Sequence, residues 1–298
     1  MNESNLPGTP AVSNTTMRHS RWERWLPTLA YALTGVAFYP ATVWLLRETL
    51  AHQQLFHALL VLMMGGMALG LEQRARLRLA FEFSLLSQVT LLLSYACMAT
   101  FYWMGHPLLA LASYTLAICS AVVFFFGQGV KRAAFTVLGT FALYMLLVLL
   151  LPVLDWPMRA LAGKNAGWVL SLFGSSVHLE LNQSLRVPEL IMVHAGRPFH
   201  VAAECNGFGL LCASLLLSLM LALYRPLPWI DKGLLIIGAA FLGFIGNVLR
   251  IVVIILLAPS VGKHYLLMHE IVGIFFYYGA LIAIWWLAAG WAKRTSRA

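Results

Sequence analysis

The chain has 298 residues, of which 61% are hydrophobic and only 10% are charged, and its formal net charge is +9. A soluble domain carries about 25% charged residues because its exterior must be wetted, so this chain is expected to face lipid. Its basic residues stand in short clusters beside apolar runs, which is typical of membrane topology signals and headgroup contact. This distribution argues against a nucleic-acid partner.

The N-terminal residues are polar and lack the apolar core of a cleavable signal peptide, so 1–20 are interpreted as a disordered cytoplasmic tail. Residues 21–298 are expected to form a single transmembrane domain. Its apolar segments are each close to the ~20 residues needed to span a bilayer. They cover 26–46, 53–71, 83–104, 107–126, 133–154, 202–224, 232–258 and 266–291. The predicted fold is therefore all-α, a polytopic membrane bundle of about eight helices.

The positions of Lys and Arg predict the orientation of these helices. Most lie at one set of helix ends: Arg18, Arg21, Arg24, Arg74, Arg76, Arg78, Lys131, Arg132, Arg225, Lys232, Lys293, Arg294 and Arg297. Fewer lie at the opposite ends: Arg47, Arg159, Lys164, Arg186, Arg197 and Lys263. Cytoplasmic loops carry the excess of basic residues, so both termini are predicted to be cytoplasmic in a plasma (inner) membrane.

One long connection, 155–201, is then predicted to lie outside the cytoplasm. Its first part, 156–173, has a helical apolar pattern and predicts an interfacial helix or a re-entrant segment. Residues 177–182 alternate apolar and polar side chains, which indicates a strand, and 191–193 form a second short run that can pair with it. A small hairpin is therefore expected over the outer ends of the helices.

Cys205 differs from the other cysteines in its surroundings. Cys97, Cys119 and Cys212 lie in apolar runs without the spacing of a metal site. Cys205 instead lies where the outer loop enters the helix predicted over 202–224. Its neighbours are polar or small: Glu204, Asn206, Gly207 and Gly209. Backbone N–H groups at a helix N-terminus lower a thiol's pKa and can hold an oxyanion, so Cys205 is a candidate nucleophile. The alternative is a small apolar helix residue.

Arg250 lies inside the apolar segment 232–258. A guanidinium in a membrane helix costs about 2.5–3.5 kcal/mol or more, so it is expected to face a protein interior or a polar cavity. Asn247 precedes it by three residues and lies on the same helix face, where it can orient the guanidinium. The alternative is an arginine that extends to the interface. Arg250 is predicted at about the depth that Cys205 can reach.

His269 stands where the last predicted helix leaves the outer surface. Histidine can transfer a proton near neutral pH, so His269 is a candidate general base. His264 competes for this role at the same level, and an interfacial histidine satisfied by water is the alternative. Because Cys205, Arg250 and His269 are predicted on one side of the membrane, they can form a catalytic group.

Three motifs resemble the exosortase/archaeosortase family of multi-pass membrane cysteine enzymes, which process sorting signals of the PEP-CTERM kind. They are ECNG at 204–207, GNVLR at 246–250 and HEIVG at 269–273. The resemblance covers about 155–291, whereas the earlier helices agree only in number and hydrophobicity. Asn206 stands where the family usually has Ser, which puts the subfamily and the substrate motif in doubt.

The resemblance implies a cysteine peptidase or transpeptidase whose site faces away from the cytoplasm. Cys205 would attack a peptide carbonyl, His269 would transfer protons, and Arg250 would stabilise the oxyanion. The candidate supporting residues are Glu204, Asn206, Asn247 and His264. The implied partner is a secreted protein with a C-terminal sorting signal, and neither a metal nor an organic cofactor is implied.

Two other classes of protein fit parts of the sequence. A small-solute transporter would use Arg250 in a central cavity, although transporters often have internal repeats and midplane helix breaks. Another membrane-embedded enzyme, such as an acyl- or glycan-transferring one, would use the outer His and Arg without Cys205. A transporter should tolerate Cys205→Ser, which distinguishes it from a cysteine enzyme.

Overall fold

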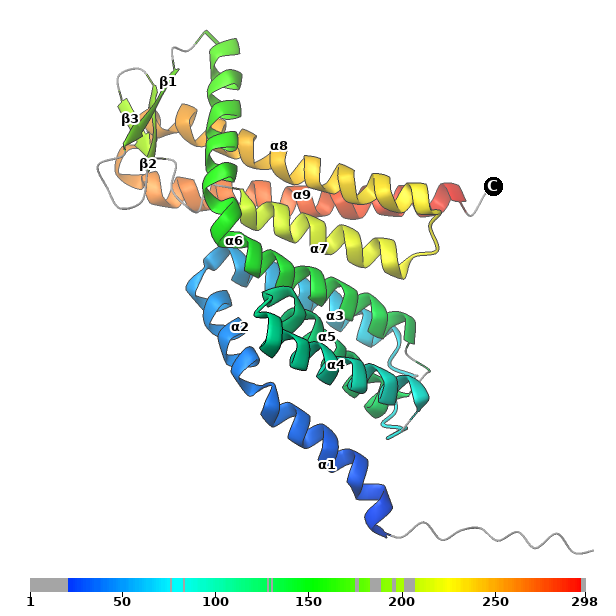
Figure 1. Ribbon diagram of the computed structural model, residues 1–298. Coiled ribbons are helices and arrows are strands. Elements are labelled where there is room, and N and C mark those ends of the chain that lie inside the picture. Colours follow the sequence, from blue (N-terminus) through cyan, green and yellow to red (C-terminus); the bar gives the residue numbers. More distant parts are fainter. Residues whose placement is uncertain are drawn as a thin grey trace, which may run out of the picture. The chain divides into compact units, whose positions relative to one another are not determined.

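The computed structural model describes residues 21–295 except 76, 83, 128, 130, 175–176, 183–188, 195–196 and 201–206. It is predominantly helical, with a small sheet between α6 and α7 (Figure 1). The helices are α1 (Arg21–Ala37), α2 (Tyr39–Ala51), α3 (Gln53–Glu72), α4 (Leu85–Met104), α5 (Pro107–Phe126), α6 (Lys131–Leu172), α7 (Phe208–Tyr224), α8 (Trp229–Val261) and α9 (Tyr265–Thr295). These helices confirm the predicted helical membrane fold.

Several of these helices have the length and composition of membrane spans. The helices that are long and apolar enough to cross a membrane are α3, α4, α5, α6 and the stretch Trp229–Gly290, which holds α8 and most of α9. In contrast, α1 and α2 reach the length of a membrane span only when they are counted together. The helix α7 is apolar but shorter than a span. The chain is therefore built from many apolar helices, as its composition predicts.

The N-terminal part of the chain differs from the sequence prediction. The predicted tail 1–20 lies outside the described residues, and the chain divides into two units at Ala37 and Phe38. The helix predicted over 26–46 is likewise divided, since α1 ends at Ala37 and α2 begins at Tyr39. Pro40 stands in the first turn of α2. Proline is favoured there because it has no N–H to donate to a preceding turn.

The helices α4 and α5 form an antiparallel pair. Gly105 ends α4 in the left-handed conformation at φ 70, and Pro107 begins α5. Ser94 and Ser113 are fully buried between the two helices, and each hydroxyl donates to the other residue's carbonyl oxygen, at 2.8 and 2.7 Å. Ser120 adds a third bond to the carbonyl of Ser87. Such hydroxyl bonds hold membrane helices together because lipid offers no alternative partner.

The helix α6 is longer than expected. The prediction ended a membrane helix at 154 and began a separate interfacial helix at 156, but α6 is a single helix of 42 residues that includes Pro152 and Pro157. At 1.5 Å per residue it is about 60 Å long, twice the thickness of a hydrocarbon core. Figure 1 shows α6 changing direction near its middle, as prolines inside a helix require. Neither Pro152 nor Pro157 therefore ends the helix.

A three-stranded antiparallel sheet follows α6. The predicted hairpin is confirmed, since β1 (Val177–Asn182) pairs with β2 (Glu189–His194). A third strand, β3 (Arg197–His200), pairs with β2 and was not predicted. Met192 of β2 is fully buried in a cluster with residues from the second half of α6 and from α8, which are Ala162, Ala166, Leu170, Val248, Ile251, Val252 and Ile255. This cluster fixes the sheet beside the part of α8 that carries Arg250.

Candidate active site

A cavity of about 700 Å³ lies between α3, α7, α8 and α9. We call it the Arg250 cavity. Its walls are Gln53, Gln54, His57, Gly207, Gly209, Leu210, Asn247, Arg250, His269, Glu270, Gly273, Ile274, Tyr277 and Tyr278. More than half of these side chains are polar or charged, although the helices that carry them are apolar. The cavity is therefore the place where the helices gather their polar groups.

The guanidinium of Arg250 lies against a glycine of α9. A Cβ added at Gly273 would stand 3.2 Å from Nη2 of Arg250 and 3.3 Å from its Cζ. Because position 273 lacks a side chain, the charged group can lie against the backbone of α9 while it borders the cavity. This placement fits the sequence expectation that Arg250 faces a polar interior and not the lipid.

Two further close approaches position the start of α7. Gly207 has φ +79, and a Cβ added there would stand 2.6 Å from Nδ2 of Asn247. Gly209 approaches the backbone of α3, with the Cα of Gln54 at 3.2 Å from the added Cβ. Only glycine combines this backbone conformation with these contacts at position 207. The start of α7 is thereby wedged between Asn247 of α8 and Gln54 of α3.

His269 and His264, the two histidines proposed as bases, differ in position. His269 is half-buried in the cavity wall, and its ring lies 6.1 Å from that of Tyr265. His264 is exposed in the short 3-10 helix η3 (Gly262–His264) and does not line the cavity. His269 is one helical turn before Gly273, where Arg250 packs. Of the two histidines, His269 is therefore the one that borders the Arg250 cavity.

The sequence analysis missed the contribution of α3. Gln53, Gln54 and His57 line the cavity, and the ring of His57 lies 5.6 Å from that of Tyr277. A signal was present, because these three polar residues stand together at one end of an otherwise apolar helix. The signal is a weak one, because polar residues at the end of a membrane helix are common at the interface with water.

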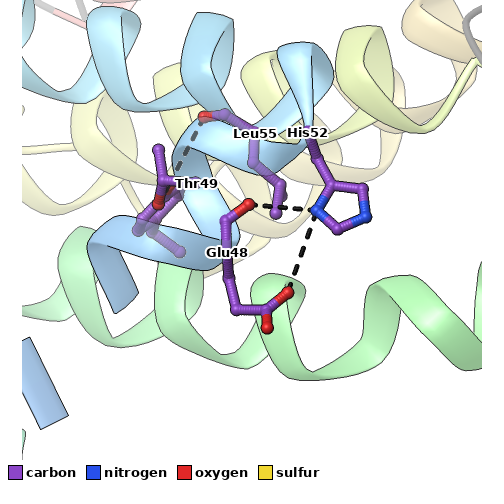
Figure 2. A network of polar contacts seen from close by, with 5 residues as sticks. Glu48, Thr49, His52 and Leu55 are labelled. Carbon is purple, nitrogen blue, oxygen red and sulfur yellow. Dashed lines mark hydrogen bonds and ion pairs between the residues drawn. The ribbon is translucent and has the colours of Figure 1, made fainter. Parts of the chain in front are cut away.

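The turn between α2 and α3 positions these residues. Figure 2 shows the side chain of His52 directed toward Glu48, with its Nδ1 at 3.0 Å from the carbonyl oxygen and 3.8 Å from a carboxylate oxygen. His52 has extended backbone angles and separates the two helices. The buried hydroxyl of Tyr144 in α6 lies 2.6 Å from that of Thr49 and donates to the carbonyl of Leu55 at 3.4 Å. These bonds hold the first turn of α3 in place.

The remaining candidate residues are not placed. Glu204, Cys205 and Asn206 lie outside the described residues. The other cysteines, Cys97, Cys119 and Cys212, are thiols without a disulfide, and none lines the Arg250 cavity. Among the described residues, no group of three His, Cys, Asp or Glu could hold a metal ion.

The described walls of the cavity combine two chemical capacities with a fixed backbone position at the start of α7. Arg250 offers a permanent positive charge and several N–H donors, which can bind a carbonyl or an oxyanion. His57 and His269 contribute imidazole rings, the groups that proteins use most often as general acids and bases. Gly207 and Gly209 let Asn247 and Gln54 pack closely against the start of α7, which fixes its backbone at the cavity wall. Such a site can bind and polarise a carbonyl group.

Comparison with known proteins adds one finding. The profile of the transmembrane exosortase family matches residues 44–286, which is most of the chain and includes the whole Arg250 cavity. No curated protein and no solved structure matches the chain.

Proposed function

The chain belongs to the transmembrane exosortase family, and from this premise we propose that it cleaves C-terminal sorting signals of secreted proteins with Cys205 as its nucleophile. The observation that carries the proposal is the joint presence of Arg250 and His269 in one cavity wall. They come from different helices, and each belongs to one of the motifs that resemble the family's.

The chain length between Cys205 and the cavity supports this assignment. Gly207 lines the cavity, and Cys205 precedes it by two residues. Two residues reach at most about 7 Å, so the thiol can meet a carbonyl that is bound in the cavity. By contrast, Cys97 and Cys119 belong to α4 and α5, which contribute no residue to the cavity wall.

In the proposed acylation step, His269 takes the proton of the Cys205 thiol, and the thiolate sulfur attacks the scissile carbonyl carbon. The carbonyl oxygen becomes an oxyanion that Arg250 binds through its N–H groups. When the tetrahedral intermediate collapses, the C–N bond breaks and His269 returns the proton to the leaving amine. The products are a thioester on Cys205 and the released C-terminal signal.

In the proposed second step, water or an amine attacks the thioester. His269 removes a proton from this acceptor, Arg250 again binds the oxyanion, and the thiolate leaves. Attack by water gives proteolysis, and attack by an amine gives transpeptidation. Asn247 supports this cycle by packing on Gly207 and so setting the position of the segment that follows Cys205.

The proposed site faces away from the cytoplasm. The supporting observation is the excess of Lys and Arg at the helix ends opposite to the cavity, which predicts cytoplasmic termini. Lys164 should then lie outside the cytoplasm. A reporter enzyme that works only outside the cytoplasm should therefore be active when it is fused after Lys164. Cytoplasmic activity of that fusion would contradict the orientation.

The central experiment compares two cysteine variants in cells that express a tagged secreted protein with a C-terminal sorting signal. Cys205→Ala should abolish conversion of the full-length substrate to the cleaved form. Cys97→Ala, which removes a half-buried thiol of α4, should process normally. Both variants should be inserted at the level of the native protein, as measured by blotting of membranes.

Normal processing by Cys205→Ala would overturn the proposal. It would leave a membrane enzyme that does not use cysteine, or a transporter that uses Arg250, as the better explanation of the cavity.

A further inference from the structure

A second cavity, of about 610 Å³, lies toward the other ends of α3, α7 and α9 and is also bordered by α6. We call it the basic cavity. It is lined by Gly65, Ala68, Leu69, Glu72, Gln73, Gly129, Arg132, Ala133, Leu217, Met220, Leu221, Tyr224, Arg225, Pro226 and Trp285. On α3, residues 57 and 72 are separated by about 20 Å at 1.5 Å per residue, so the two cavities are distinct.

Two arginines form the polar side of the basic cavity. The Cζ of Arg132 lies 5.8 Å from the ring centroid of Tyr224, and that of Arg225 lies 5.5 Å from the ring of Trp285. Arg225 also donates from Nη1 to the carbonyl oxygen of Ala288 at 3.1 Å. These ring contacts hold both guanidinium groups at the wall of the cavity.

Neither guanidinium has a carboxylate partner in the described part of the chain, where no Asp or Glu oxygen lies within 4.0 Å of Arg132 or Arg225. Glu72 lines the same cavity without pairing with either of them. Two positive charges against one negative charge leave the cavity with a net positive charge. It is therefore suited to an anion.

The rest of the wall is apolar. Leu69, Met220 and Leu221 are buried at the inner side of the cavity, and Leu217 adds to them. Trp285 is 53% exposed on the outward side, where a tryptophan ring at the end of a membrane helix meets the headgroup region. A cation pair beside an apolar surface suits a ligand that has both an anionic and an apolar part.

We infer that the basic cavity binds the phosphate headgroup of an anionic membrane phospholipid. Arg132 and Arg225 would hold the phosphate oxygens, while the acyl chains would lie along the apolar residues of α3 and α7. Further basic residues, Arg74 and Lys131, lie near the same helix ends, as expected where a bundle meets an anionic leaflet. This inference does not depend on the function proposed for the Arg250 cavity.

The test uses the full chain, purified in a neutral detergent, and follows its thermal unfolding while phosphatidylglycerol is titrated into the micelles. Phosphatidylglycerol should raise the unfolding midpoint, whereas phosphatidylcholine and inorganic phosphate at equal concentration should not. The apparent affinity for phosphatidylglycerol should fall about 30-fold in the double variant Arg132→Gln/Arg225→Gln. The matched control Arg78→Gln/Lys232→Gln, with the same change in net charge, should bind normally.

The single variant Arg132→Gln is included in case the double variant does not fold. Arg132 is exposed and its contact is with the ring of Tyr224, so its substitution should leave the fold intact. It should weaken phosphatidylglycerol binding about fivefold. Equal affinities of the native chain and both arginine variants would overturn the inference. Equal stabilisation by inorganic phosphate would also overturn it, because the anion alone and not a lipid would then be the ligand.

Discussion

The α4–α5 pair and the Arg250 cavity both carry polar side chains within apolar helices, but the two regions use them differently. In the α4–α5 pair, the hydroxyls of Ser94 and Ser113 are fully buried and satisfy each other's backbone across the helix contact. Around the cavity, polar residues from α3, α8 and α9 converge on a space of about 700 Å³. The first arrangement holds helices together, whereas the second leaves room for a ligand.

This difference gives a criterion for reading polar residues in membrane helices. A small polar residue that has a matching residue on the neighbouring helix adds to stability. A charged residue that borders a cavity costs free energy on membrane insertion. Its presence therefore indicates a functional site. Substitutions in the two regions should therefore separate activity from stability.

The largest effect among the cavity variants is expected for His269→Ala. Loss of a general acid–base group should lower the rate of substrate processing about 10²–10⁴-fold and leave a slow residual activity. His264→Ala is the matched control and should process normally, because His264 is exposed outside the cavity. The measurement is a time course of substrate cleavage in membranes. If His57→Ala is inactive and His269→Ala is active, the general base is His57 of α3 and not His269.

Arg250→Lys should have the next largest effect. Lysine keeps the charge but loses the planar set of donors that can bind one oxygen at two points. Loss of oxyanion binding should slow processing about 10²–10³-fold. The control Arg47→Lys changes an exposed arginine of α2 and should have no effect. Equal processing rates for the native chain and Arg250→Lys would show that the charge alone is sufficient.

Gly273→Leu tests the contact that positions the guanidinium. A side chain at 273 must displace Arg250, because even a Cβ would stand 3.2 Å from its Nη2. A displacement of about 1 Å can slow catalysis about 100-fold. Gly279→Leu is the matched control on the same helix, since a Cβ added at Gly279 meets nothing within 4 Å. If both variants process substrate equally, the close packing of Arg250 on α9 has no part in activity.

Ser113→Ala should have the smallest effect on activity. It removes one of the two reciprocal bonds of the α4–α5 pair, so the free energy of unfolding should fall by about 1 kcal/mol while processing is unchanged. The exposed Thr100→Ala, which removes a bond within α4 only, is the control. Unfolding in detergent and the processing assay together give the answer. A loss of processing in Ser113→Ala without a loss of stability would break the comparison between the two regions.

The features that could be predicted from the sequence are those with strong local contrast. Arg250 stands alone among apolar residues, so its position in a protein interior follows from the cost of exposing a cation to lipid. Residues 177–182 alternate in polarity, which is enough to predict one strand of the hairpin. The helices α4 and α5 are bounded by Gly105 and Pro107, and both were predicted close to their observed bounds.

The features that could not be predicted depend on contacts between distant parts of the chain. Pro152 and Pro157 are breakers by local rules, but in α6 the helix continues through them, as membrane helices allow when neighbours satisfy the freed carbonyls. Strand β3 contains Pro198, which lowers its strand propensity, and it forms by pairing with β2. The cavity wall from α3 depends on how α3 packs against the start of α7, which no local pattern specifies.

The most direct test of the central claim is the chemical identity of the covalent intermediate. Membranes that hold the full chain and its substrate should be quenched in acid during turnover, digested, and analysed by mass spectrometry. The account predicts a thioester between Cys205 and the new C-terminus of the substrate, which hydroxylamine releases as a hydroxamate and which Cys205→Ala does not form. A substrate adduct on another residue, with Cys205 recovered unmodified during active processing, would contradict it.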